Sequence, residues 1–137
     1  MPGITPDFAN EYTITQARNP AALTATAQSS GIDCRDTGPD VFVILNIGAV
    51  TGTSPTLDVK LQSSINDNTA NAEAAADAYA DITGAAFSQL TDSDANSIQT
   101  LQIHNRNERY VRLYYTVAGT NPSFLVGATV MTKKVSW

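Results

Sequence analysis

The sequence holds few side chains of the kinds that enzymes use to move protons or attack a substrate. His104 is the only histidine among 137 residues, and it lies in the polar run His104-Asn-Arg-Asn-Glu108. A histidine can act as a general base, but one in a polar loop between strands is more often solvated. The Gly-x-Ser-x-Gly pattern, which places a nucleophilic serine at a sharp turn, is absent from the sequence. We therefore expect a protein that is not an enzyme.

An acidic cluster that begins at Asp92 has the spacing of the first half of a calcium-binding loop. Asp94 and Asn96 follow at the third and fifth positions. The sixth position, where the loop needs glycine, is Ser97, and the twelfth, where it needs a bidentate glutamate, is Ile103. The cluster therefore predicts a hydrophilic turn and no metal site.

Cys34 is the only cysteine, so the sequence offers neither an internal disulfide nor a cysteine-based zinc site. Carboxylate pairs for sugar hydrolysis could come from Asp92 with Asp94 or from Asp77 with Asp81, but nearness in sequence does not set the separation that this chemistry requires. The glycines stand singly in turns, so no phosphate cradle is present. We expect no cofactor.

Charge is distributed unevenly along the chain. Charged residues make up 15% of the sequence, against roughly 25% in typical domains, and the net charge is −5. Residues 1–97 carry three basic and twelve acidic side chains, whereas residues 98–137 carry five basic and one acidic. The acidic part would repel phosphate, so we expect no nucleic-acid partner and favour contacts between oppositely charged protein surfaces. Alternatively, the basic residues only keep an exposed edge strand soluble.

The composition predicts one domain preceded by an arm. With 42% hydrophobic residues in 137, the chain is long enough to bury a sizeable core. Residues 1–10 hold two prolines and a glycine, which predicts an extended N-terminal arm with Ile4 and Phe8 as its apolar anchors. Residues 11–137 are expected to form a single β-sandwich domain.

The N-terminus has neither the charged nor the apolar region of a secretory signal. The longest strongly apolar run, residues 41–45, is too short to span a bilayer. We therefore expect a soluble protein that is made in the cytoplasm and has no membrane partner.

Residues 109–133 predict a β-hairpin, because two β-rich runs flank a Gly/Asn/Pro cluster. Side chains alternate between the two faces of a strand. In the first run this alternation predicts an inner face of Val111, Leu113, Tyr115 and Val117, and an outer face that carries Tyr110, Arg112 and Tyr114. The second run, residues 123–130, is apolar on both faces and predicts a central or covered strand.

Two further runs form the predicted centre of the core. Residues 41–47 are almost continuously apolar, which predicts a strand buried on both faces. Residues 57–62 alternate, with Leu57, Val59 and Leu61 inward. We expect these two strands to pair as neighbours across the intervening loop.

Shorter apolar runs raise the expected number of strands to about eight or nine. The alanine-rich residues 71–78 predict a helical turn or a mobile loop. Turn signals recur at roughly the 8–12-residue spacing of sandwiches and barrels. The fold class predicted is therefore all-β, an antiparallel β-sandwich that is jelly-roll-like.

Four segments together resemble a known family. They are Leu57-Asp-Val-Lys-Leu-Gln-Ser63, Tyr79-Ala-Asp-Ile-Thr-Gly-Ala-Ala-Phe-Ser-Gln89, Arg109-Tyr-Val-Arg112 and Thr116-Val-Ala-Gly-Thr-Asn-Pro-Ser-Phe124. In composition and order they are similar to the capsid decoration, or cement, proteins of tailed bacteriophages. The resemblance covers roughly residues 41–131 and carries no catalytic residues.

The resemblance implies a β-sandwich on the capsid surface of a virion, where a dimer or trimer bridges subunits of the major capsid protein without turnover. We expect interface residues at two places. The predicted hairpin would contribute Arg109, together with Tyr110, Arg112 and Tyr114 from its outer face. The two ends of the chain would contribute Ile4 and Phe8, from an arm reaching a neighbouring subunit, and Trp137, either on a neighbour or on the domain's own core.

Two other functions stay open. The aromatic side chains of residues 110–124 could form a sugar-stacking platform in a carbohydrate- or receptor-binding module, although aromatics and arginine are also enriched in core and interface. A tail or connector component of the virion is the other alternative. Copy number in the particle separates such a component from symmetric shell decoration.

Overall fold

The computed structural model describes residues 8–65 and 79–134 of the chain. Its strands are β1 (Tyr12–Leu23), β2 (Ala27–Gln28), β3 (Ile32–Asp33), β4 (Thr37–Ser64), β5 (Ala80–Ala86), β6 (Ser97–Ile103) and β7 (Tyr110–Lys134). The helical segments are the short α1 (Phe8–Glu11) and the 3-10 turn η2 (Asp92–Asp94). All strand pairs are antiparallel, so the predicted all-β antiparallel fold is confirmed. Within the described ranges, no helix has the length and apolar character needed to cross a membrane.

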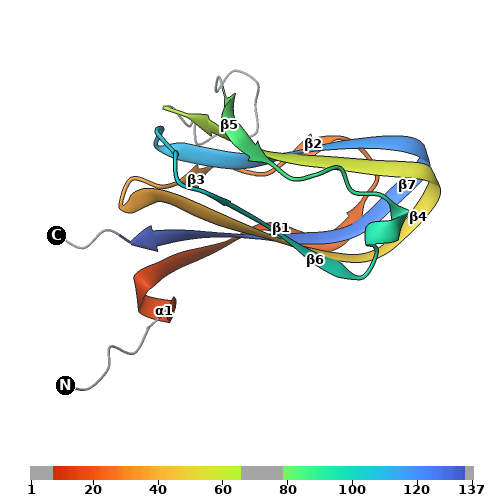
Figure 1. Ribbon diagram of the computed structural model, residues 1–137, viewed down its shortest axis with the longest axis horizontal. Helices are drawn as coiled ribbons and strands as arrows, with labels where there is room; N and C mark the ends of the chain where they lie inside the picture. Colours follow the sequence, from red (N-terminus) through yellow and green to blue (C-terminus); the bar gives the residue numbers. More distant parts are fainter. Residues whose placement is uncertain (1–7, 66–78, 135–137) are drawn as a thin grey trace.

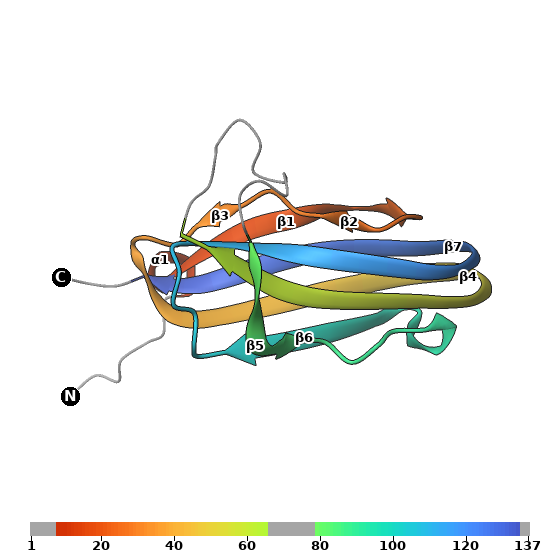
Figure 2. The same cartoon turned by 90° about the horizontal axis from the view of Figure 1, so that it is seen from above.

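A long two-stranded ribbon of β4 and β7 forms the centre of the molecule and folds over on itself (Figures 1 and 2). The two strands pair from Thr37↔Lys134 at one end to Ser64↔Tyr110 at the other. Residues 41–47 and 126–132 form a first layer, with β6 beside β4 and β1 beside β7. Residues 57–64 and 110–117 form a second layer, with β5 beside β4 and the short β2 and β3 beside β7.

Two sequence predictions about strand pairing are wrong. Residues 109–133 do not fold into a hairpin, because both halves of β7 pair with β4 and lie in different layers. Residues 41–47 and 57–62 do not pair with each other either, because they are the two halves of β4. The Gly/Pro clusters that separate the runs are bends in continuous strands, and the two bends lie opposite each other, as Thr53↔Thr120 and Thr56↔Ala118 show.

The core lies between the two layers, where the predicted inner faces meet. The largest fully buried side chains come from both halves of both long strands: Tyr115, Phe124, Leu45, Ile47, Leu57, Leu61, Leu113, Val41, Val43, Val59, Val111 and Val126. Burying each such aliphatic side chain contributes about 1.5–3 kcal/mol. The prediction that residues 41–47 are buried on both faces is wrong, because Phe42 and Ile44 are only half-buried and Asn46 is exposed on the outer side.

The two bends repeat the same short sequence. The first reads Val50-Thr-Gly-Thr-Ser-Pro-Thr-Leu57 and the second reads Val117-Ala-Gly-Thr-Asn-Pro-Ser-Phe124. The glycines have φ of +113° at Gly52 and +118° at Gly119. Residues with a side chain rarely adopt this backbone conformation. A Cβ on Gly52 would lie 2.7 Å from the backbone oxygen of Asn121, and a Cβ on Gly119 would lie 2.8 Å from that of Ser54. Each bend therefore needs a glycine because the other bend's backbone occupies the space.

We expect Gly52→Ala and Gly119→Ala to destabilise the fold more than Gly84→Ala does. Gly84 also has a positive φ, +79°, but nothing lies within 4 Å of its Cβ position. The substitution at Gly84 therefore introduces backbone strain alone, on the order of 1–3 kcal/mol, while the other two add a clash with backbone. Urea unfolding of the three variants measures the difference, and equal losses would contradict a close contact between the bends.

Candidate interface on the outer face of the second layer

The outer face of the second layer is where the sequence places the interface residues of β7. The strand register agrees with their predicted direction, because Gln62, on the outer face of β4, lies directly opposite Arg112, and Lys60 lies opposite Tyr114. Tyr110 and Tyr114 are half-buried rather than fully exposed. β5 borders the same face, with Asp81 opposite Gln62. The face is therefore built from parts of three strands that are far apart in sequence.

Arg112 is held inside this face. Only 6% of its surface is exposed, although the alternation predicts an outward side chain. Its Nε donates a hydrogen bond to Oε1 of Gln62 at 2.9 Å, and its guanidinium carbon lies 4.2 Å from the centre of the Tyr79 ring. Stacking and a planar hydrogen bond are contacts that arginine makes better than lysine. Arg112 thus orders its neighbours and contributes little surface of its own.

Asp81 connects this arginine contact to an ion pair. Gln62 donates from Nε2 to Oδ1 of Asp81 at 2.9 Å, and the Lys60 ammonium donates to Oδ2 at 3.0 Å. The hydrogen bond from Gln62, followed by that from Lys60, holds the pKa of Asp81 below its usual value. Lys60 Nζ also lies 5.4 Å from the centre of the Tyr114 ring. We call the set Lys60, Gln62, Tyr79, Asp81, Arg112 and Tyr114 the outer network.

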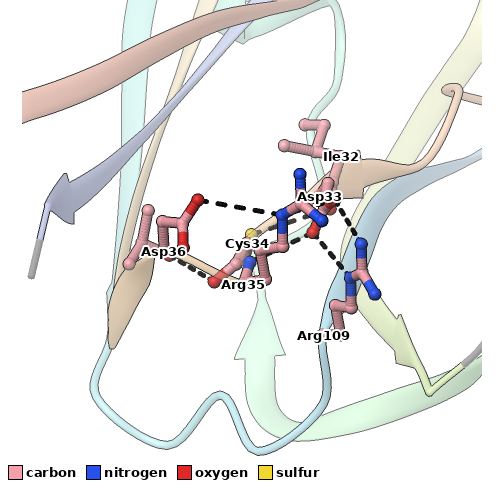
Figure 3. Close-up of polar contacts among 7 residues, drawn as sticks. Ile32, Asp33, Cys34, Arg35, Asp36 and Arg109 are labelled. Atoms are coloured by element: carbon pink, nitrogen blue, oxygen red, sulfur yellow. Dashed lines mark hydrogen bonds and ion pairs between the residues drawn. The ribbon is translucent and has the colours of Figure 1, made fainter.

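A second polar cluster lies at the start of β7 (Figure 3). Arg109 donates from Nε and Nη2 to the two carboxylate oxygens of Asp33, at 2.9 and 2.8 Å. The backbone N–H of Arg35 also donates to Asp33, at 3.1 Å. The Arg109 guanidinium lies 4.8 Å from the centre of the Tyr110 ring. The two hydrogen bonds between Arg109 and Asp33 fix two of the predicted interface residues, Arg109 and Tyr110, relative to β3.

The Asp33–Arg109 pair makes stability depend on pH. Hydrogen bonding from Arg109 is the main reason that the pKa of Asp33 lies below 3.8 in the folded chain. A carboxylate with a lowered folded pKa contributes stability above its unfolded pKa, and that contribution disappears as pH falls through the folded value. Both side chains are partly exposed, so the contribution is screened by solvent.

We expect Arg109→Met to lower the free energy of unfolding at neutral pH, and the difference from wild type to shrink below pH 3.8. Urea unfolding across this pH range measures it. Asp33→Asn provides the matched background. In that background, the change in the free energy of unfolding caused by Arg109→Met should depend little on pH. A difference between wild type and Arg109→Met that stays constant with pH would assign the effect to the Tyr110 contact instead.

Cys34 and Arg106 hold the strand ends behind this cluster. Cys34 is fully buried, and burial raises the pKa of its thiol. Its backbone N–H donates to the carbonyl of Arg109 at 2.8 Å. Arg106 donates from Nη2 to the carbonyls of Thr37 and Gly38, at 2.9 and 2.8 Å, so it ties the loop before β7 to the start of β4. These contacts give both residues a structural role.

Of the side chains considered for chemistry, Asp81 belongs to the outer network, whereas His104 and Asp94 make other contacts. His104 Nδ1 lies 2.7 Å from Asp40, at an exposed position. Asp94 accepts a hydrogen bond from the N–H of Thr91 at 2.8 Å and closes a capping box over η2, as expected of a hydrophilic turn. Residues 8–65 and 79–134 hold no group of three or more potential metal ligands.

Several predicted residues lie outside what the structure describes. Ile4, Trp137 and Asp77, with the rest of residues 71–78, are not among the described residues. Phe8 begins α1, so residues 8–10 of the predicted extended arm are helical. The predicted interface roles of Ile4, Phe8 and Trp137 stay predictions, as do those of the residues of β7.

Sequence reasoning missed the residues that connect the outer network. Alternation along residues 57–62 places Lys60 and Gln62 on the outer side, but it does not show which strand lies beside them. The pairing with Asp81 depends on a register shift between Lys60 and Gln62 along β5. The aromatic-x-Asp pattern at Tyr79 and Asp81 was the only signal that pointed to this strand.

Comparisons with known proteins give a fold likeness only. No family model and no curated protein matches the sequence. The crystal structure of the SPBc2 prophage-derived protein YomS is similar over 88% of this chain and 93% of its own, at 11% identity and a TM-score of 0.45. A protein of Bacillus endospore appendages, a novel family of disulfide-linked pili, is similar over 98% of this chain and 100% of its own, at 15% identity and a TM-score of 0.41. Neither likeness assigns a function to this chain.

Proposed function

We propose that this chain is a virion structural protein that decorates and stabilises a capsid shell by bridging subunits of the major capsid protein. It would act by binding alone, as a homo-oligomer on the capsid surface. The resemblance to cement proteins of tailed bacteriophages motivates the proposal. Its structural support is the arrangement of the resembling segments in the fold.

Three of the four segments that carry the resemblance lie next to one another. Residues 57–63 belong to β4, residues 79–89 contain β5, and residues 109–112 begin β7. All three are in the second layer, where β4 pairs with β5 on one side and with β7 on the other. These three segments thus share the layer that contains the outer network, while the fourth, residues 116–124, crosses the bend of β7.

The outer network suits a surface that binds without rearranging. Its charged groups are already paired and its aromatic rings are already stacked, as the Arg112–Gln62 and Lys60–Asp81 contacts illustrate. Ordering of long side chains opposes association, so a surface that is ordered beforehand binds more tightly for the same area. A protein that binds only the assembled shell stabilises that shell by mass action.

Copy number in the particle tests the proposed location. We expect purified virions from the genome that encodes this chain to contain it in a fixed ratio to the major capsid protein, at hundreds of copies, because shell decoration follows shell symmetry. Quantitative mass spectrometry of intact particles measures the ratio. A count of about a dozen or fewer would indicate the tail or connector alternative.

Truncation of the outer aromatic residues tests the proposed surface. We expect Tyr110→Ala and Tyr114→Ala to weaken binding to undecorated shells by about tenfold or more, the usual effect of removing an interface aromatic residue. Thr116→Ala, at an exposed position on the same face of β7, is the matched control. Co-sedimentation with shells measures binding. Full binding by both tyrosine variants would exclude this face, and glycan-array binding that is lost in Tyr114→Ala would favour the carbohydrate-binding alternative.

A further inference from the structure

Strand β6 forms one edge of the first layer. Among the described strands it pairs only with β4, through a ladder without interruption from Val41↔Ile103 to Ile47↔Ser97. It lies along one side of the molecule in Figure 2. An edge strand presents a row of backbone N–H and C=O groups to any strand that can reach it. β6 therefore has the geometry of a pairing edge.

The strand at the opposite edge of the same layer has features that oppose pairing with another chain, whereas β6 has none. β1 contains Arg18 and Pro20, and its register with β7 shifts twice, between Gln16 and Arg18 and between Arg18 and Ala21. Charge, proline and bulges are the usual features that prevent edge-to-edge pairing. β6 reads Ser97-Ile-Gln-Thr-Leu-Gln-Ile103 and has none of them.

The outer side of β6 is uncharged and carries one large apolar side chain, beside the polar Thr100 and Gln102. Ile98 is 66% exposed, the highest value among the large hydrophobic side chains that are described. Thr100 is exposed and lies opposite Ile44, and Gln102 lies opposite Phe42. Large exposed apolar side chains that adjoin half-buried ones on one sheet face are a feature of interaction sites.

We propose that β6 pairs antiparallel with β6 of a second copy of this chain, about a twofold axis at Thr100, so that two first layers join into one sheet. In such a contact residue i meets j and j meets i. Thr100 would meet its own copy, Ile98 would meet Gln102, and Gln99 would meet Leu101.

The absence of charge in β6 identifies a second copy as the partner. A twofold contact sets the side chain at the axis against its own copy, so a charged residue there would meet a like charge. The chain carries eight basic and thirteen acidic side chains, yet residues 97–103 include none of them. A charged partner strand, in contrast, would find no opposite charge on β6. This contact uses the first layer and does not depend on shell binding by the second.

Substitutions at the axis test the proposal. We expect the full-length chain to be dimeric in sedimentation velocity, and Thr100→Lys and Thr100→Glu each to be monomeric, because the twofold sets like charges side by side. An equimolar mixture of the two variants should recover the dimer, because lysine then meets glutamate. Recovery of the dimer in the mixture shows that residue 100 faces its own copy. Variants that had lost their fold would not recover the dimer on mixing.

Gln16→Lys is the matched control, since Gln16 is exposed on the other edge strand of the same layer; this variant should stay dimeric. Hydrogen exchange of the wild-type chain gives a reading without substitution: amides of β6 should exchange more slowly as concentration rises, and those of β1 should not. A monomeric wild type, a dimer that Gln16→Lys disrupts, or a dimer that both Thr100 variants retain would each overturn the proposal.

Discussion

The close packing of two bends is the contact on which the rest of the structure depends. Each bend places a glycine of positive φ against the backbone of the other, Gly52 against Asn121 and Gly119 against Ser54. Because the bends coincide, β4 and β7 can fold over together without losing their pairing on either side. The two inner faces then meet, and the buried aliphatic core forms between layers that are halves of the same two strands.

The fold makes two outer faces of different character. On the second layer, Arg112, Gln62, Asp81 and Lys60 satisfy one another through hydrogen bonds and ion pairs. On the first layer, Ile14, Ile98 and Leu125 are exposed at 57%, 66% and 42%. A protein with one ordered polar face and one face that exposes several apolar side chains can make two different contacts at once, as the proposed function would require.

The direction of side chains along single strands could be predicted from the sequence, because apolar and polar residues alternate. The residues predicted to point inward at 57–61 and 111–115 are buried, and those predicted to point outward lie on the outer face. Pairing could not be obtained in this way, because a Gly/Pro cluster is compatible with a turn and with a bend. The repeated Gly-Thr-x-Pro at 52–55 and 119–122 is the sequence signal for the pairing of β4 with β7. Two equal bends fit against each other when their strands are neighbours. The outer network stayed hidden because it needs the register of β5.

The folded ribbon also determines when the chain can fold. β4 contacts β7 at every level of the molecule, and β7 comes after all the other described strands in the sequence. The pair closest in sequence is Ser64 with Tyr110, and the separation grows steadily toward Thr37 with Lys134. Folds dominated by such distant contacts form in about milliseconds to seconds rather than microseconds. During synthesis, β1, β2, β3 and β4 therefore remain without their partner β7 until it has left the ribosome, so both layers close late and together.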